Sequence, residues 1–417
     1  KDKREIHIKM IHTAWAKEQG VPIGAIRDAV RPAQVLNGEI LEDGRAPVPQ
    51  WLEGWVYSEN DCLFVNTTMS NYAIKREAFR AKFDRMPEPA EFDTDAAEFA
   101  LNNAQIPTVA SGIFFPGEER FFEYDGRPVY NTYHESGIDP AKIPDAPLDP
   151  DGEAEGVATL LRHLDNLVPE ERERGLVLDY LAYVYQNPLN KARWGLLFWG
   201  IEGNGKTYFY NLMSELMGEN VGGATTSMVE SRFNNWCVNK RLIGIDEIRI
   251  SGTSKYTILD KLKPMLSDKV VHVEPKGRSA FKAPNFANYI LTTNYMDAVP
   301  VGDNDRRYCI IFTYHRRKED LFAQHGGVDE TTAYFDNLFS VTLDGAGLLG
   351  IARFLRDRDT TLNEDFTPQG RAPSTKGVEI MRDASTSDDK RDVMDAIAEY
   401  QCEVVNEEML DITYLTN

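Results

Sequence analysis

The sequence has few cysteines, no long apolar run and no overall basic charge. Its four cysteines, Cys62, Cys237, Cys309 and Cys402, are far apart and form no CxxC pair, which argues against a zinc site or a disulfide framework and predicts a reducing compartment. No run approaches the roughly 18 apolar residues of a membrane-spanning helix, and no charged-then-apolar leader opens the chain. These absences predict a soluble, cytoplasmic protein.

The net charge of −20 argues against a nucleic-acid partner only as an average. Residues 191–320 contain 19 Lys+Arg against 14 Asp+Glu, a net charge of +5, whereas the remainder contains 27 against 52, a net charge of −25. A weakly basic centre between acidic flanks is compatible with DNA or RNA binding. The chain begins at Lys1 rather than Met, which predicts a piece of a longer protein.

The length of 417 residues predicts two or three domains. In residues 1–150 we expect an α+β accessory domain with an amphipathic helix at Ile6–Lys17, a hairpin in GWVYSENDCLFVN (54–66) and another turning at Asp125-Gly126. The stretch DPAKIPDAPLDPDGEAEG (139–156), rich in Pro, Asp and Gly, predicts a linker at a domain boundary.

Beyond this linker the pattern becomes helical and then alternates. Helical periodicity predicts a helical, collar-like segment at 151–190. Strands and helices both occur in 191–320, which predicts an α/β region. The region 321–417 is expected to be mainly helical, with DNLFSVTLDGAGLLGIARFLRDR as the clearest helical segment and a charged helix in SDDKRDVMDAIAEYQ, residues 387–401.

A glycine-rich loop follows the first strand of this core. The strand Trp194–Trp199 leads into GIEGNGKT, which matches GxxxxGK[ST] in full and precedes a helix at Thr207–Met217. In such a loop backbone N–H groups surround the phosphates of ATP, Lys206 reaches the β- and γ-phosphates, and the Thr207 hydroxyl binds Mg²⁺. A chance glycine-rich turn is the alternative. The predicted nucleotide-binding residues are Gly200, Glu202, Gly203, Asn204, Gly205, Lys206, Thr207 and Tyr208.

Acidic and polar residues end two later strands. Leu242–Ile245 ends in Asp246 and Glu247, 40 residues after Lys206. Asp246 is expected to hold Mg²⁺ through water, and Glu247 to activate the attacking water as general base. The strand in FANYILTTN ends at Asn294, which is expected to hold that water near the γ-phosphate. Two solvated acids and a turn-forming Asn are the alternatives.

Two further elements carry basic side chains. Arg306 and Arg307 precede an apolar strand, and either could be an arginine finger donated to a neighbouring subunit, or the two could be a salt-bridged surface pair. The segment VVHVEPKGRSAFKAP predicts a hairpin whose tip is basic and could contact a phosphate backbone, or could be merely solvated. Its predicted DNA-binding residues are His272, Lys276, Arg278 and Lys282.

These elements, in the motifs GIEGNGKT, IGIDEI, ILTTN and DRRY, resemble the superfamily 3 helicases of the AAA+ ATPases, and more narrowly the helicase portion of phage or mobile-element primase-helicases. The resemblance covers about 157–312. It implies an α/β, AAA+ P-loop core at 191–320 with a central parallel sheet flanked by helices, and ATP and Mg²⁺ as cofactors. It also implies a homo-hexameric ring around single-stranded DNA and the host cytoplasm as location. It also implies that a primase-polymerase domain could precede Lys1.

Alternatives of other classes stay open. A non-unwinding AAA+ switch for origin binding or replisome loading would share the same motifs, and so would a small-molecule kinase, although a kinase has no need of Glu247 to activate water. Asp93 and Asp95 form a DxD pair, but their polar context predicts a helix start, and we assign no primase chemistry to them. Trp51 and Trp55 could stack on bases or anchor a small core.

Overall fold

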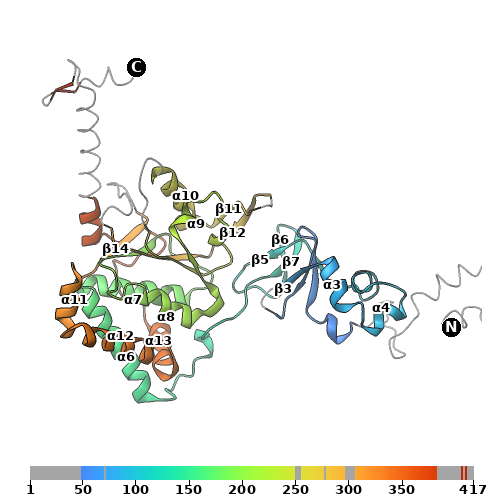
Figure 1. Ribbon diagram of the computed structural model, residues 1–417, viewed down its shortest axis with the longest axis horizontal. Coiled ribbons are helices and arrows are strands. Elements are labelled where there is room, and N and C mark those ends of the chain that lie inside the picture. Colours follow the sequence, from blue (N-terminus) through green and yellow to red (C-terminus); the bar gives the residue numbers. More distant parts are fainter. Residues whose placement is uncertain are drawn as a thin grey trace, which may run out of the picture. The chain divides into compact units, whose positions relative to one another are not determined.

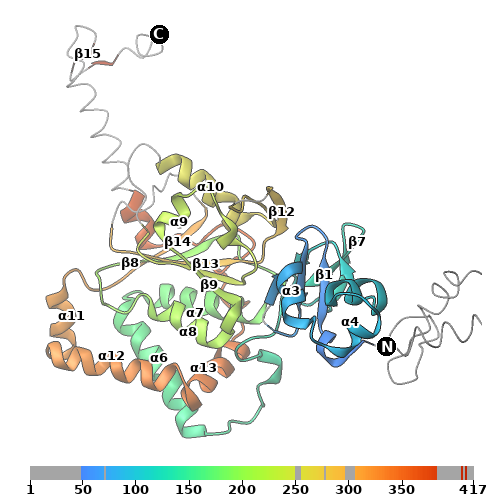
Figure 2. The same cartoon turned by 45° about the vertical axis from the view of Figure 1, so that its right-hand side comes forward.

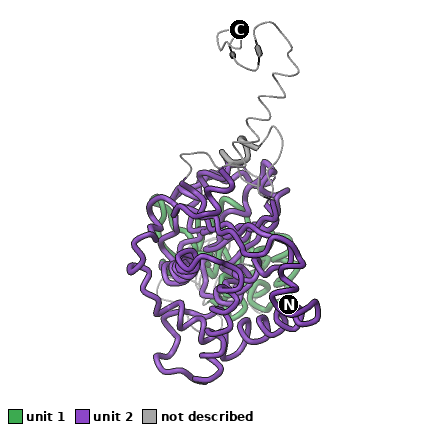
Figure 3. The backbone as a smooth tube through the Cα atoms, turned by 90° about the vertical axis from the view of Figure 1, so that its left-hand side faces the viewer, with its two compact units in different colours: residues 1–113, 118–132 green, residues 114–117, 133–417 purple. Residues whose placement is uncertain are grey.

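The computed structural model describes residues 48–69, 72–248, 255–276, 279–295 and 306–382, with two short strands at Val405–Asn406 and Met409–Leu410. The chain divides into two compact units, coloured separately in Figure 3. Unit 1 comprises 1–113 and 118–132, and unit 2 comprises 114–117 and 133–417. The stretch 139–156, where the sequence placed a boundary, lies within unit 2. The helices expected at Ile6–Lys17 and in 387–401 lie outside the described residues.

Unit 1 contains a four-stranded sheet in the order β3-β2-β1-β4. Strands β1 (Trp55–Ser58) and β2 (Leu63–Asn66) pair antiparallel, so the hairpin predicted from GWVYSENDCLFVN is confirmed. Strand β3 (Tyr72–Lys75) pairs antiparallel with β2, and β4 (Thr108–Val109) pairs parallel with β1. The short helices of this unit are α3 (Arg76–Phe83), α4 (Pro87–Glu91) and α5 (Ala96–Glu98).

The second predicted hairpin is also present. Strands β6 (Phe121–Tyr124) and β7 (Arg127–Asn131) pair antiparallel, and β5 (Gly112–Ile113) joins β7. The turn residues Asp125 and Gly126 have φ of 50° and 70°, the doubly left-handed conformation that a two-residue turn between twisted strands requires.

The core of unit 1 is aromatic. Helix α3 packs Phe79 and Phe83 against the sheet, with both side chains buried. Trp55 is buried and meets Phe79 edge-on with ring centroids 5.1 Å apart, and Trp51 stacks on Phe83 at 4.9 Å. Both tryptophans therefore anchor this core. That was one of the two roles the sequence left open for them, and stacking on bases was the other.

Unit 2 is built on a five-stranded sheet in the order β14-β8-β13-β10-β9. All neighbouring strands run parallel. The strands are β8 (Gly195–Trp199), β9 (Val221–Ala224), β10 (Leu242–Ile245), β13 (Asn288–Thr293) and β14 (Tyr308–Phe312). All residues of β8, β10, β13 and β14 are buried, because a parallel sheet carries helices on both faces. The fold is therefore mixed α/β with a parallel sheet.

Helices cover both faces of this sheet, as Figures 1 and 2 show. On one face lie α7 (Glu171–Gln186) and α8 (Tyr208–Met217), and on the other α9 (Thr226–Glu230) and α10 (Lys255–Ser267). Helix α6 (Pro150–Leu167) packs on α7 from below. After the sheet follow α11 (Lys318–His325), α12 (Val328–Thr342) and α13 (Gly345–Asp357), and residues 376–382 are also helical.

Helix α6 begins inside the stretch 139–156, which was expected to be a linker at a domain boundary. The last seven residues of this stretch form the first turns of α6, close to the start at 151 of the predicted helical segment. Asp149 caps the helix by accepting a hydrogen bond from the Gly152 N–H at 3.2 Å, and Pro150 occupies the first helical position, where its missing N–H costs nothing. Gly156 then meets Gly347 of α13 so closely that a Cβ on Gly156 would lie 2.3 Å from the Gly347 Cα.

No single helix among the described residues is long and apolar enough to cross a membrane. Helices α12 and α13 reach that length and composition only together, and the chain bends by 71° between them.

Candidate functional site

The carboxyl ends of three parallel strands bring four of the six predicted catalytic residues to one edge of the sheet: Lys206, Asp246, Glu247 and Asn294. The loop 200–207 follows β8, Asp246 follows β10, and Asn294 follows β13. Because β13 lies between β8 and β10, Asn294 lies between the loop and the acids. The Lys206 ammonium donates to Asn294 Oδ1 at 3.0 Å, and the Thr207 hydroxyl lies 3.5 Å from Asp246 Oδ1. Segments about 90 residues apart thus meet at one edge of the sheet.

The loop has the backbone conformation that its glycines predict. Gly203 and Gly205 have φ of 79° and 92°, in the left-handed region that favours glycine. Gly200 is required for space, since a Cβ there would lie 1.7 Å from Thr313 Oγ1. The buried Asn204 side chain donates to the same Thr313 hydroxyl at 2.9 Å. The loop is therefore fixed to the residue that follows β14.

Lys206 is folded back onto its own loop. Its ammonium donates to the Gly200 carbonyl at 2.9 Å, to the Ile201 carbonyl and to Asn204 Oδ1 at 3.3 Å, besides Asn294. Burial lowers the pKa of Lys206 to about 8, and the nearby carboxylates offset part of that shift. The ammonium is thus charged at neutral pH, poorly hydrated and aimed at the inside of the loop.

The two acids after β10 have different surroundings. Asp246 Oδ1 accepts hydrogen bonds from the Thr292 hydroxyl and from the Glu247 N–H, the latter at 3.1 Å. Glu247 is exposed and has a φ of 50°, a conformation that is strained for a residue other than glycine, by about 1 to 3 kcal/mol. Strain of this kind concentrates at functional sites. Both acids are exposed, and the hydrogen bonds from Thr292 and from the Glu247 N–H hold the Asp246 carboxylate in place.

A cavity of about 190 Å³ adjoins these groups, lined in part by Thr207, Tyr210, Asp246 and Thr292. Within the described residues no cluster of three or more His, Cys, Asp or Glu could hold a metal by itself. A hydroxyl and a carboxylate are nevertheless the hard oxygen donors that Mg²⁺ prefers, and this ion commonly takes its remaining ligands from phosphates and water. Thr207 and Asp246 therefore fit Mg²⁺.

Two of the predicted nucleotide ligands point elsewhere. Glu202 is exposed, and its carboxylate pairs with the Lys318 ammonium at 3.3 Å. Tyr208 is buried in the core, with its ring 4.9 Å from that of His163 and 6.2 Å from that of Phe339. Tyr208 is the first residue of α8, and its position on the helix directs the side chain into the core. The loop motif alone does not reveal which way this side chain points.

Arg306 and Arg307 lie at the opposite edge of the sheet from the loop. They precede β14, which runs parallel to β8, and the Arg307 carbonyl accepts from the N–H of Gly195, the first residue of β8. The five residues of β8 span about 16 Å, so the arginines are separated from the loop of their own chain by roughly that length.

The predicted basic hairpin is present. Strands β11 (Val270–Val273) and β12 (Phe281–Pro284) pair antiparallel, with His272 opposite Lys282 and both side chains exposed. The alternating residues Val271 and Val273 are buried in the hydrophobic cluster that also contains Leu262 of α10. One face of the hairpin is thus packed, and the basic face is open to solvent.

The base of this hairpin is fixed by hydrogen bonds. Asn234 donates to the His272 carbonyl at 2.8 Å and accepts from the Glu274 N–H at 2.7 Å, while Arg232 pairs with Glu274 at 3.0 Å. Lys276 beyond this clamp is exposed. Arg278 lies outside the described residues.

Sequence reasoning missed the residues that follow β14. Tyr314, Arg316 and Lys318 are exposed at the same edge of the sheet as the loop, and the Arg316 guanidinium lies 3.8 Å from the centre of the Phe312 ring. The basic run HRRK directly after an apolar strand was the available signal. A cavity of about 710 Å³ opens here, lined by Asp165, Asn166, Tyr314, Arg316, Asp320, Ala323 and Gln324.

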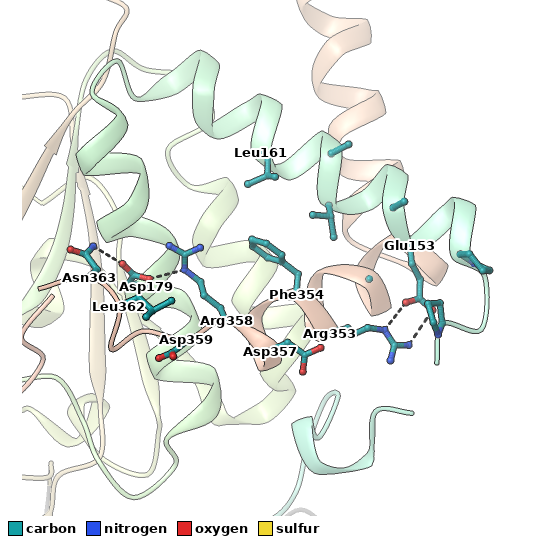
Figure 4. A pocket seen from close by; sticks show the side chains of 16 residues that line it. Glu153, Leu161, Asp179, Arg353, Phe354, Asp357, Arg358, Asp359, Leu362 and Asn363 are labelled. Carbon is teal, nitrogen blue, oxygen red and sulfur yellow. Dashed lines mark hydrogen bonds and ion pairs between the residues drawn. The ribbon is translucent and has the colours of Figure 1, made fainter. Parts of the chain in front are cut away.

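A larger cavity of about 1010 Å³ lies between α6, α7 and α13 (Figure 4). Two ion pairs lie in its lining: Arg353 pairs with Glu153 at 2.9 Å, and Asp179 accepts from Arg358 and from Asn363, each at 2.7 Å. None of the residues predicted for the nucleotide site lines it. We assign these ion pairs a structural role, because they join α13 and the residue after it to α6 and α7.

The acidic pair of unit 1 serves a structural purpose. Asp95 caps α5 by accepting from the Glu98 N–H at 2.8 Å and lies 3.3 Å from Arg80. Asp93 is an exposed turn residue with a φ of 54°. The interpretation of DxD as a helix start is confirmed.

Comparisons with known proteins give distant relatives. A family of unknown function (DUF5906) matches residues 198–307, about a quarter of the chain and the part that carries the loop, the acids and the hairpin. The DNA primase-polymerase of Nitratiruptor phage NrS-1 is 23% identical over 273 residues, which are 63% of this chain and 35% of that protein. The chain is thus homologous to part of a phage protein and spans about a third of its length.

Solved structures of that phage protein resemble the fold. The apo structure of the NrS-1 C-terminal region matches with a TM-score of 0.59 and 17% identity, covering 80% of this chain and 73% of that one. A second apo structure, its A form, matches with a TM-score of 0.56 and 16% identity over 88% and 82%. At this identity the likeness shows the mixed α/β fold and no more.

Proposed function

We propose that this chain is an ATP hydrolase with an AAA+ P-loop core that works as a DNA helicase in phage or mobile-element replication. The observation that carries the proposal is the convergence of Lys206, Thr207, Asp246 and Asn294 at one sheet edge, with a lysine–amide distance of 3.0 Å. The homology to part of a phage DNA primase-polymerase supports the replication context.

The residues of the site divide the work of hydrolysis between them. Loop N–H groups and Lys206 hold the phosphates, and Asn294, already bonded to Lys206, turns its amide toward the attacking water. Glu247, exposed beside Asp246, takes the proton of that water. Mg²⁺, held by Thr207 and Asp246, would neutralise charge on the phosphate oxygens. Bringing these groups together lowers the barrier mainly by positioning and electrostatics.

The basic hairpin supplies the contact with DNA in this proposal. Strand β13 connects β12 to Asn294, so the hairpin and the nucleotide site are attached to opposite ends of one strand. A change at Asn294 on hydrolysis can therefore be transmitted along β13 to Lys276. In a ring of subunits, such movements draw one strand of DNA through the central channel.

Lys276→Ala is expected to preserve basal ATP turnover and to abolish stimulation by single-stranded DNA. The exposed ammonium contacts no part of the nucleotide site, and one lost phosphate contact lowers the salt dependence of DNA affinity by about one unit of slope. Titration of labelled oligonucleotide at several salt concentrations measures that slope. Lys269→Ala, at the other end of β11, is the matched control, and unwinding by Lys276→Ala at the wild-type rate would contradict the hairpin assignment.

A mixture of Arg307→Ala and Lys206→Ala subunits is expected to hydrolyse ATP although each variant alone is inactive. Arg307 lies at the far edge from its own loop, so it can reach only the nucleotide of a neighbour. Interfaces that pair an intact loop with an intact arginine then regain activity. A second mixture, of Arg306→Ala with Lys206→Ala subunits, shows which of the two arginines acts. Absence of recovery in both mixtures would contradict a finger donated in trans.

A forked-duplex strand-displacement assay separates the helicase from the non-unwinding switch. A helicase releases the labelled strand only with hydrolysable ATP. A switch hydrolyses ATP and binds DNA but leaves the duplex paired. A small-molecule kinase transfers the γ-phosphoryl group of ATP to its acceptor and releases no inorganic phosphate. Mass measurement with an ATP analogue and single-stranded DNA is expected to give six protomers per strand.

A further inference from the structure

A buried histidine lies behind the phosphate loop. His163, on α6, is 2% exposed, and its Nε2 lies 3.3 Å from the Gly205 carbonyl oxygen. Its Nδ1 lies 2.9 Å from the hydroxyl of Tyr334 on α12, which in turn lies 3.3 Å from the Asn166 amide nitrogen. The ring leaves no room for a side chain on the loop, since a Cβ at Gly205 would lie 2.4 Å from His163 Cε1.

The direction of every hydrogen bond in this chain of groups is determined. The Gly205 carbonyl can only accept, so His163 Nε2 must carry a proton. Burial lowers the pKa of His163 to about 4, so the ring is neutral and its Nδ1 must accept. Tyr334 therefore donates to Nδ1, which leaves its oxygen to accept from the Asn166 amide. Asn166, Tyr334 and His163 form one directed relay that ends on the loop.

The Gly205 carbonyl matters because its orientation decides what faces the phosphates. A phosphate loop works only if its N–H groups face the anion and its carbonyls face away. Gly205 has a φ of 92°, where glycine permits the peptide to rotate readily, and within the described part of the chain its carbonyl otherwise accepts only from the Tyr208 N–H at 3.1 Å.

We propose that His163 is a positioning residue that holds the Gly205 carbonyl away from the phosphates, and that Tyr334 fixes the tautomer that lets it do so. The relay makes the loop conformation dependent on the C-terminal helices: Tyr334 belongs to α12 and stacks on His325 of α11 with ring centroids 4.0 Å apart. The inference rests on the proposed function of the loop in binding ATP.

Three variants test the relay. His163→Leu removes the donor to the Gly205 carbonyl. It is expected to raise the KM for ATP about tenfold, which corresponds to the loss of one hydrogen bond, and to change kcat less than twofold. His163→Gln places an amide N–H near the former Nε2 and is expected to restore most of that KM. Tyr334→Phe keeps the stacking on His325 and is expected to give an intermediate KM.

The tautomer gives a readout that a purely structural role would not change. In ¹⁵N-labelled protein, the His163 nitrogens are expected to report the Nε2–H form, and Tyr334→Phe is expected to shift the ring toward the Nδ1–H form. Tyr183→Phe is the matched control, because it removes another buried hydroxyl, which accepts from Gln369 at 2.9 Å far from the loop. It should change neither KM nor tautomer.

The outcomes distinguish this inference from the proposed function. A folded His163→Leu variant with the wild-type KM, or an Nδ1–H tautomer in the wild type, overturns the relay and leaves the ATPase intact. Failure of the wild type to bind ATP overturns the proposed function, even where the Nε2–H tautomer is seen.

Discussion

Lys206→Ala is expected to abolish ATP turnover, with a loss on the order of 100-fold or more, the range measured when one preorganised donor is removed from an active site. The ammonium is the one side-chain cation that the described residues place inside the loop, where burial strengthens its attraction for phosphate. Initial rates of phosphate release at saturating ATP measure the loss.

The control for this variant must account for the loop itself. Lys206 also bonds two loop carbonyls, so its removal could loosen the loop as well as remove a charge. Thermal unfolding and circular dichroism report whether unit 2 remains folded. Lys240→Ala, which removes a half-buried lysine of the same unit, is the control. Turnover by a folded Lys206→Ala variant within tenfold of the wild type would contradict the phosphate site.

Glu247→Gln is expected to bind ATP normally and to hydrolyse it about 100- to 10,000-fold more slowly, the contribution of a general base. The amide has the shape of the carboxylate but cannot accept the proton of the attacking water. The backbone N–H of Glu247, which bonds Asp246 and Thr292, is unchanged, so the neighbouring acid stays in place. Equilibrium binding of a fluorescent ATP analogue, followed by single-turnover hydrolysis, separates the two steps.

Glu230→Gln is the matched control, an exposed glutamate at the end of α9. Its hydrolysis rate should equal that of the wild type. If Glu247→Gln hydrolyses ATP at the wild-type rate, another group must be the base. If it loses ATP binding instead, Glu247 acts on the nucleotide and not on the water.

Much of the nucleotide-binding edge could be predicted because local patterns fix it. A buried run followed by glycines and a helix start specifies both strand and loop, and the runs ending at Asp246 and Asn294 specify two more strands. Since parallel strands share one carboxyl edge, the meeting of these ends follows from the strand pattern alone. The strand order that puts Asn294 between Lys206 and Asp246 does not, because nothing in the local sequence sets it.

Contacts between remote helices and the loop could not be predicted. His163 looks like an ordinary core residue of an amphipathic helix, and Tyr334 lies 171 residues further on. Tyr208 directly follows the loop motif, yet the helical rotation at its position sends it into the core. Asp149 and Pro150 carried the signal for the start of α6, but the surrounding prolines and acids concealed it.

The most direct test of the account is the release of inorganic phosphate from ATP in the absence of any acceptor. We predict Mg²⁺-dependent release by the wild-type chain, stimulated by single-stranded DNA and lost in both Lys206→Ala and Glu247→Gln. No release above buffer, or equal release by the wild type and both variants, would contradict an ATP-hydrolysing site built on the loop 200–207.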